Sequence, residues 1–135
     1  MKRITREMIK IYGTKDKCWM GYKLVRTNKG LNATFHHLEK RECGGKETID
    51  NGAILSDIAH NYLNIIECKD KPIYDAINGI LMVVNKQGYA PTREQYRIIN
   101  CLLEMFEEKH KDDVNSRGKK LIKHKYLERE TRGLK

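Results

Sequence analysis

The feature that most constrains the fold is a series of short elements between residues 33 and 67. The first of them, ATFHHL, has the composition of a strand, and the polar loop EKRECGGKETIDNG follows it. The run Ala53-Ile54-Leu55 predicts a second strand, and the apolar residues after it recur at helical spacing. Ser56 or Asp57 is well placed to cap that helix. The order strand, loop, strand, helix predicts a small α+β unit.

Helical periodicity dominates the chain after this unit. An apolar stripe that ends at Gly88 predicts a helix over about 72–87. The residues Thr92-Arg93-Glu94-Gln95 form a capping box, which predicts that a further helix occupies about 92–111. We therefore expect additional α-helices to pack around the α+β unit.

The two ends of the chain carry weaker signals. At the N-terminal end we expect a short helix that Thr5 caps and Gly13 ends. Residues 18–27 are mixed and aromatic, which indicates a strand or an extended arm. We expect residues 1–114 to form one domain. The many charges and few apolar anchors of 115–135 indicate a basic tail that is disordered, or helical only when bound.

The charge is unevenly distributed along the chain. Residues 1–46 contain 12 Lys or Arg against 4 Asp or Glu, residues 47–116 contain 7 against 12, and residues 117–135 contain 8 against 2. Basic ends around an acidic middle favour a nucleic-acid partner over a membrane, because the basic segments lack a strong apolar face. No run approaches the roughly 20 apolar residues of a membrane span, and the start lacks a signal-peptide core. We therefore expect a cytoplasmic protein.

Three of the five histidines lie within the α+β unit. Strand alternation sends His36 and His37 to opposite faces, whereas His60 and Asn64 share one face of the helix. Compact folding can then bring His36, His60 and Asn64 together as nitrogen and oxygen donors, with His37 free beside them as a base. Taken one at a time, each histidine is more often a packed or surface residue, and only the joint spacing favours a site.

That spacing resembles the motif of HNH endonucleases, which is built on a ββα-metal finger. His37 precedes Asn51 by 14 residues, Asn51 precedes His60 by 9, and the loop carries a Gly-Gly pair. The likeness covers residues 35 to about 67 and points to a small member of phage or prophage type. It implies an α+β fold in which a ββα-metal finger packs with additional helices.

The resemblance implies a role for each matching position. His37 corresponds to the general base that takes a proton from water, and Asn51 to the residue that braces the loop and orients that base. His36 and His60 correspond to metal ligands, and Asn64 stands where some members have a further histidine. The implied reaction is metal-dependent hydrolysis of a DNA phosphodiester bond, with RNA as a less expected substrate.

The implied cofactor is a divalent cation. An amide at position 64 favours Mg²⁺ or Mn²⁺, with Ni²⁺ or Zn²⁺ as alternatives. The four cysteines lie far apart, without a Cys-x-x-Cys pair, and Ser56 and Ala59 stand where many members have one. We therefore expect no structural zinc, and reduced, partly buried thiols.

The basic residues near the motif and in the tail are the expected DNA contacts. Beside the motif these are Lys40, Arg41 and Lys46; in the tail they are Arg117, Lys119, Lys120, Lys123 and Lys125. Two other functions remain open. The chain could be a non-catalytic HNH-like accessory protein of a phage or mobile element that binds nucleic acid or a nuclease. More remotely, it could be a purely structural metal finger.

Overall fold

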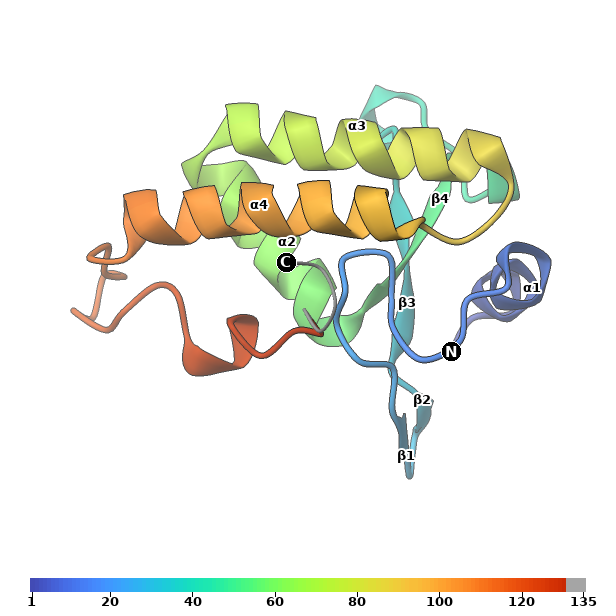
Figure 1. The fold of residues 1–135 in the computed structure, drawn as a ribbon, viewed down its shortest axis with the longest axis horizontal. Coiled ribbons are helices and arrows are strands. Elements are labelled where there is room, and N and C mark those ends of the chain that lie inside the picture. The colour runs from blue at the N-terminus through green and yellow to red at the C-terminus, as the bar shows by residue number, and fades with distance from the viewer. Residues whose placement is uncertain (131–135) are drawn as a thin grey trace.

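The helices and strands follow the expected α+β order (Figure 1). The computed structural model describes residues 1–130. In chain order the elements are α1 (Arg3–Tyr12), β1 (Arg26–Thr27), β2 (Gly30–Leu31), β3 (Ala33–His37), β4 (Gly52–Ser56), α2 (Asp57–Lys69), α3 (Lys71–Gln87) and α4 (Arg93–His110). Single 3₁₀ turns occupy Arg41–Cys43, Ile49–Asn51 and His124–Tyr126. None of the described helices is long and apolar enough to cross a membrane.

The predicted strand, loop, strand and helix are β3, the loop after it, β4 and α2. The two strands are antiparallel, with His36 opposite Ala53 and His37 opposite Gly52. The helix α2 begins directly after β4, and the Ser56 hydroxyl caps it by accepting a hydrogen bond from the Ala59 amide at 3.1 Å. Both the order of the elements and the Ser56 cap are confirmed.

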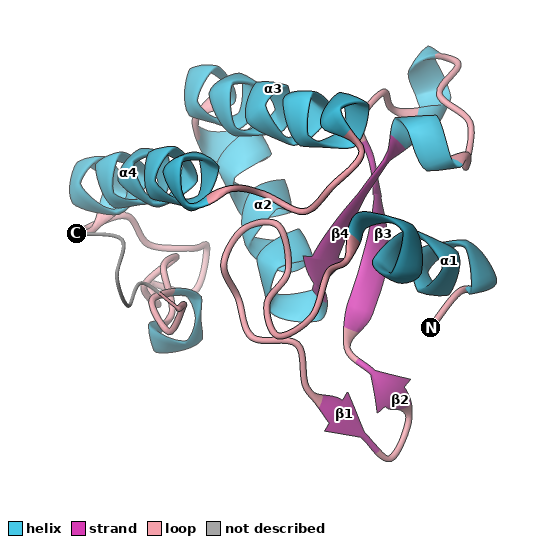
Figure 2. Ribbon diagram, turned by 45° about the vertical axis from the view of Figure 1, so that its right-hand side comes forward, coloured by secondary structure: helices cyan, strands magenta, loops and turns pink. Residues whose placement is uncertain are grey.

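The β3–β4 sheet has helices on both faces. In Figure 2, α1 lies on one side of the sheet and α2 and α3 on the other. Gly52 permits the approach of α1, since a Cβ atom there would lie 2.4 Å from the Phe35 ring and 2.9 Å from the Met8 sulfur. Strand alternation therefore presents Phe35 and His37 to the side of α1, and Thr34 and His36 to the side of α2.

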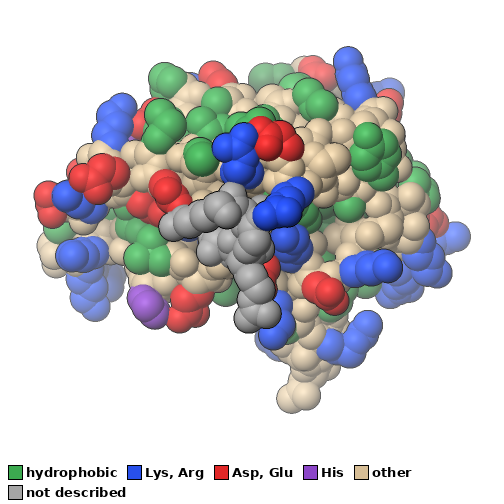
Figure 3. Space-filling model, viewed as in Figure 1, with side chains coloured by type: hydrophobic (Ala, Val, Ile, Leu, Met, Phe, Trp, Pro, Cys, Tyr) green, Lys and Arg blue, Asp and Glu red, His purple; other side chains and the backbone are tan. Residues whose placement is uncertain are grey.

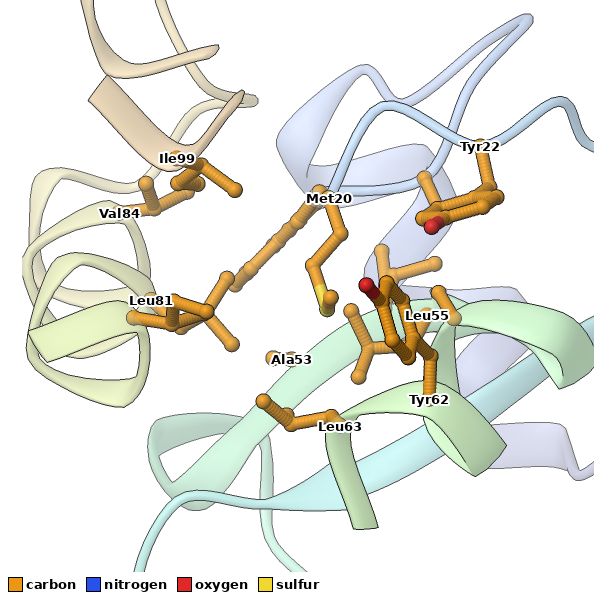
Figure 4. Packing of buried hydrophobic residues seen from close by; sticks show 14 of the residues in the cluster. Met20, Tyr22, Ala53, Leu55, Tyr62, Leu63, Leu81, Val84 and Ile99 are labelled. Carbon is orange, nitrogen blue, oxygen red and sulfur yellow. The ribbon is translucent and has the colours of Figure 1, made fainter. Parts of the chain in front are cut away.

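The core is one cluster that joins the sheet to the three long helices and also includes Met8 and Tyr12 of α1. Figure 4 shows Met20 between Leu81 and Val84 on one side and Leu55 and Tyr62 on the other. Residues 18–24 therefore enter the core from a loop, which is held where the Trp19 amide donates to the Ile54 carbonyl at 3.0 Å. Of the strand or extended arm expected over 18–27, only β1 is a strand, and Lys23 forms an isolated bridge with Lys17.

The helix ends follow the local signals with one exception. Gly13 and Gly88 end α1 and α3 at φ values of 69° and 85°, and the Thr92–Gln95 capping box is present at the start of α4. The expected Thr5 cap is wrong, because α1 begins at Arg3 and buries Thr5 within the helix.

Residues 121–130 pack against the body of the protein, so the expectation of a tail that is disordered, or helical only when bound, is wrong for this part, whereas residues 115–120 are exposed. Tyr126 is 4% exposed and stacks on Tyr62, with ring centroids 4.6 Å apart. Arg129 donates to Glu107 at 2.6 Å and to the Asn100 side chain at 2.7 Å. A few contacts with residues far away in the sequence hold this segment. The expected tail also includes 131–135, which lie outside the described residues.

Candidate functional site

One pocket of about 330 Å³ collects the predicted site residues from β3 and α2. It is lined by His36, His37, His60 and Asn64, together with Lys40, Arg41, Glu42, Glu67 and Tyr74. The pocket lies where the end of β3 meets α2 and the start of α3. The fold thus brings together the three histidines and the amide that the sequence pattern singled out.

The hydrogen bonds of His36 fix which of its ring nitrogens carries a lone pair. The amide of Asn78 donates to the Leu38 carbonyl at 3.0 Å, so its oxygen faces His36 Nε2 at 2.8 Å. Because an amide oxygen only accepts, Nε2 is the protonated nitrogen and Nδ1 carries the lone pair of the neutral ring. Burial lowers the pKa of His36 to about 4, so the ring is neutral at pH 7.

A similar argument assigns the lone pair of His60. The Thr34 hydroxyl donates its only proton to the Leu55 carbonyl at 2.8 Å, so it accepts from His60 Nδ1 at 2.9 Å. The lone pair of the neutral ring is then on Nε2. Burial lowers the pKa of His60, which also favours the neutral form. The rings of His36 and His60 are nearly perpendicular, with centroids 5.5 Å apart.

His37 lies on the other face of the strand, as predicted. Its ring packs edge-on against Phe35, with centroids 4.9 Å apart. Its Nε2 atom is buried and has no hydrogen-bond partner among the described residues. Burial lowers the pKa of His37, an effect that the charge of Glu47 opposes and that of Arg41 reinforces. A neutral imidazole with an unpaired nitrogen is chemically able to accept a proton.

Asn51 closes the loop between β3 and β4. Its side-chain oxygen accepts from the Glu39 amide at 2.7 Å, and its nitrogen donates to the carbonyls of Glu39 at 3.0 Å and Lys46 at 2.8 Å. The Asn51 carbonyl also accepts from the Leu38 amide at 2.9 Å, next to His37. The loop is so tight that a Cβ atom on Gly45 would lie 1.8 Å from the Glu39 carbonyl oxygen, which explains one glycine of the pair.

The three loop cations occupy different environments. Lys40 lines the pocket but pairs with Glu67 across it at 2.5 Å. Arg41 also lines the pocket and is exposed. Lys46 is exposed and does not line the pocket, and its carbonyl holds Asn51. Arg41 is therefore the cation of this loop that is best placed to contact a phosphate group in the pocket.

Five residues of the site were missed in the sequence. One is Glu42, which lies beside Arg41 in the loop and lines the pocket. Glu67 follows His60 by seven positions and so shares its helix face, and Thr34 shares the strand face of His36; both positions could have been found from periodicity. Asn78 and Tyr74 belong to α3, and no local pattern connects them to the strand.

The packed part of the basic tail around Tyr126 lies away from the pocket. Tyr62, on which Tyr126 stacks, is about 200° around α2 from His60, since each helical residue turns the chain by about 100°. Lys123 and Lys125 flank Tyr126 and therefore lie on the far side of α2. The structure does not bring these predicted contacts together with the histidines.

The donor set limits the kind of metal site that the pocket could form. No group of three or more His, Cys, Asp or Glu side chains that could hold a metal ion is present in residues 1–130. The predicted set is smaller, with lone pairs on His36 Nδ1 and His60 Nε2 and an amide on Asn64. Such a set fits an open site that water and phosphate oxygens complete. All four cysteines are free, and only Cys18 is buried, so the expectation of partial burial is wrong for the other three.

No family model, curated protein or solved structure matches the chain. The geometry of the pocket is therefore the basis for a functional proposal.

Proposed function

We propose that this protein is a metal-dependent endonuclease of the HNH type that hydrolyses phosphodiester bonds in DNA. The observation that carries the proposal is the histidine pocket. Three imidazoles from β3 and α2 line it, burial lowers the pKa of each, and hydrogen bonds assign the lone pairs of two of them. The order β3, braced loop, β4 and α2 supports the same class.

Each residue of the site has a separate role in the proposed hydrolysis. His37 accepts a proton from the attacking water, because its ring is neutral at pH 7 and has an unpaired nitrogen. Asn51 holds the loop that follows His37 and so keeps the ring in position. The exposed guanidinium of Arg41 binds a phosphate oxygen of the substrate. A divalent cation bound by His36 Nδ1, His60 Nε2 and the Asn64 amide would act as a Lewis acid on the phosphate and on the leaving oxygen.

The buried contacts of His36 and His60 serve to orient their rings. Asn78 and Thr34 each hold one nitrogen, which leaves the other nitrogen of each ring with its lone pair. Replacing Asn78 by Asp would retain an acceptor for His36 but remove the donor to the Leu38 carbonyl.

The test is cleavage of supercoiled plasmid with Mg²⁺, Mn²⁺, Ni²⁺ or Zn²⁺, each beside a chelator control. We expect His37→Ala to lower the cleavage rate by roughly 10²–10⁴-fold, as for the loss of a general base. The matched control is His124→Ala, because that side chain is 84% exposed and lies in the tail segment. Absence of cleavage by the wild-type protein with every metal would refute the enzyme and favour the non-catalytic accessory protein. Equal rates for His37→Ala and wild type would refute the role of His37.

A further inference from the structure

A short hairpin projects from the end of the molecule where β3 begins. Figures 1 and 2 show β1 and β2 extending beyond the rest of the fold. Asn32 holds the base of the hairpin, since its side-chain oxygen accepts from the Val25 amide at 2.8 Å and its nitrogen approaches Asp57 at 3.4 Å. At the tip, the Thr27 hydroxyl donates to the Gly30 carbonyl at 3.0 Å. Both residues of β1 are exposed, so the hairpin adds little to the core.

Unpaired cations line the concave surface between this hairpin and α1. The surface encloses about 420 Å³, and four of its eight lining residues are basic and none is acidic: Arg6 and Lys10 from α1, and Arg26 and Lys29 from the hairpin. All four are exposed, and none forms an ion pair within residues 1–130. Figure 3 shows Lys and Arg side chains beside the base of the projection. Four like charges held together without carboxylates favour a polyanion as the partner.

We propose that this cleft between α1 and the hairpin binds the phosphate backbone of double-stranded DNA. The choice of DNA rests on the proposed function, but the cleft itself is separate from the histidine pocket. A two-stranded ribbon has the dimensions that enter a major groove of about 12 Å, and the tip residues Thr27, Asn28 and Lys29 are polar. A membrane surface would require an apolar face, which this tip lacks.

The cleft and the histidine pocket lie at opposite ends of β3. The hairpin ends at Leu31 and His37 is six residues further along the strand, a path of about 20 Å at roughly 3.3 Å per residue. The same length corresponds to about six base pairs, at about 3.4 Å between successive phosphates of one strand along the helix axis. A duplex backbone that lay in the cleft and ran along β3 would reach the level of His37 after about half a helical turn.

The test measures binding without chemistry. A fluorescently labelled duplex of about 20 base pairs is titrated in a chelator over a series of salt concentrations, with fluorescence anisotropy as the readout. One variant carries glutamine at all four cleft cations. A second variant has the same change in net charge at exposed cations elsewhere that form no ion pair within residues 1–130: Lys15, Lys69, Lys86 and Arg93. Circular dichroism establishes that both variants are folded.

Each lost phosphate contact should reduce the magnitude of the slope of log affinity against log salt by about 0.9. For the cleft variant, the magnitude of this slope should therefore fall by about 3 to 4. We expect its affinity at low salt to fall by more than tenfold, and the second variant to change much less. Equal losses in the two variants would overturn the inference, because general charge would then explain binding. Tighter binding of the wild-type protein to single-stranded DNA or to anionic vesicles would overturn the choice of duplex DNA.

The outcome separates this inference from the proposed function. If the cleft variant loses the salt slope and the wild-type protein never cleaves plasmid, the cleft is supported and the endonuclease is refuted. If plasmid is cleaved and the cleft variant binds duplex like wild type, the cleft alone is refuted. The cleft is also refuted if neutralising Lys119, Lys120, Lys123 and Lys125 removes the slope while the cleft variant retains it.

Discussion

Replacing Asn51 tests whether its hydrogen bonds across the loop are needed for catalysis or only for folding. Asn51→Ala removes three hydrogen bonds, to the Glu39 amide and to the carbonyls of Glu39 and Lys46. A hydrogen bond contributes a net 1 kcal/mol or so, and the exposed loop lets water replace part of what is lost. We therefore expect the free energy of unfolding to fall by about 2 kcal/mol. For a domain of this size, that corresponds to a decrease in melting temperature of roughly 5–10 °C.

The effect of Asn51→Ala on turnover should exceed its effect on folding. The hydrogen bond from the Leu38 amide to the backbone carbonyl of residue 51 survives, so the strands stay paired while the loop after His37 loosens. A displacement of about 1 Å at a reacting group can cost on the order of 10²-fold in rate. Metal affinity should change little, because Asn51 does not line the histidine pocket.

The variant Asn51→Asp sharpens the test because it keeps the size of the side chain. One carboxylate oxygen can still accept from the Glu39 amide, but the other faces the carbonyls of Glu39 and Lys46, which have no proton to donate. At pH 7 we expect Asn51→Asp to be no more stable and no faster than Asn51→Ala. The control is Asn61→Ala, an exposed position on α2 that does not line the pocket.

The assays for these variants are thermal melting by circular dichroism, calorimetry with Mn²⁺ and single-turnover cleavage of plasmid. Wild-type turnover by Asn51→Asp would refute the reasoning, since the carbonyl contacts would then be unimportant. An unchanged melting temperature for Asn51→Ala would show that the three hydrogen bonds contribute nothing to the stability of the loop.

Three further predictions concern the metal, the pH and the packed tail segment. The double variant His36→Ala, His60→Ala should lose most of its affinity for Mn²⁺ in calorimetry, and an unchanged affinity would place the ion elsewhere. Burial lowers the pKa of His36 from 6.5 to about 4, so in a chelator its neutral form stabilises the fold fully above pH 6.5. As the pH falls from 6.5 to 4, the free energy of unfolding measured by urea denaturation should decrease by roughly 3 kcal/mol. The variant His36→Gln should not show this decrease. Arg129→Ala should lower the free energy of unfolding by roughly 3–5 kcal/mol, because it leaves the Glu107 carboxylate largely buried without its ion pair. The double variant that also carries Glu107→Gln should regain part of this stability.

Several parts of the fold were predictable because their causes are local in the sequence. Ser56 and the Thr92–Gln95 box place helix starts through hydrogen bonds that span three residues, and Gly88 ends a helix through its own backbone conformation. The alternation of β3, which separates His36 from His37, is equally local. The same local reasoning was wrong at Thr5, where burial against the rest of the molecule outweighed the capping preference of the residue.

The sequence by itself determined which residues share a strand face or a helix face, and only the tertiary structure decided what those faces meet. The partner of His36 is Asn78, 42 residues away, and that of Arg129 is Glu107, 22 residues away; no periodicity encodes either pair. The packing of residues 121–130 likewise depends on a long-range contact, the stacking of Tyr126 on Tyr62 of α2. Periodicity reports the backbone conformation of a few neighbouring residues, whereas long-range contacts depend on how whole elements pack. The pattern could therefore indicate the histidines, but packing alone decided their protonation and separated the tail from the pocket.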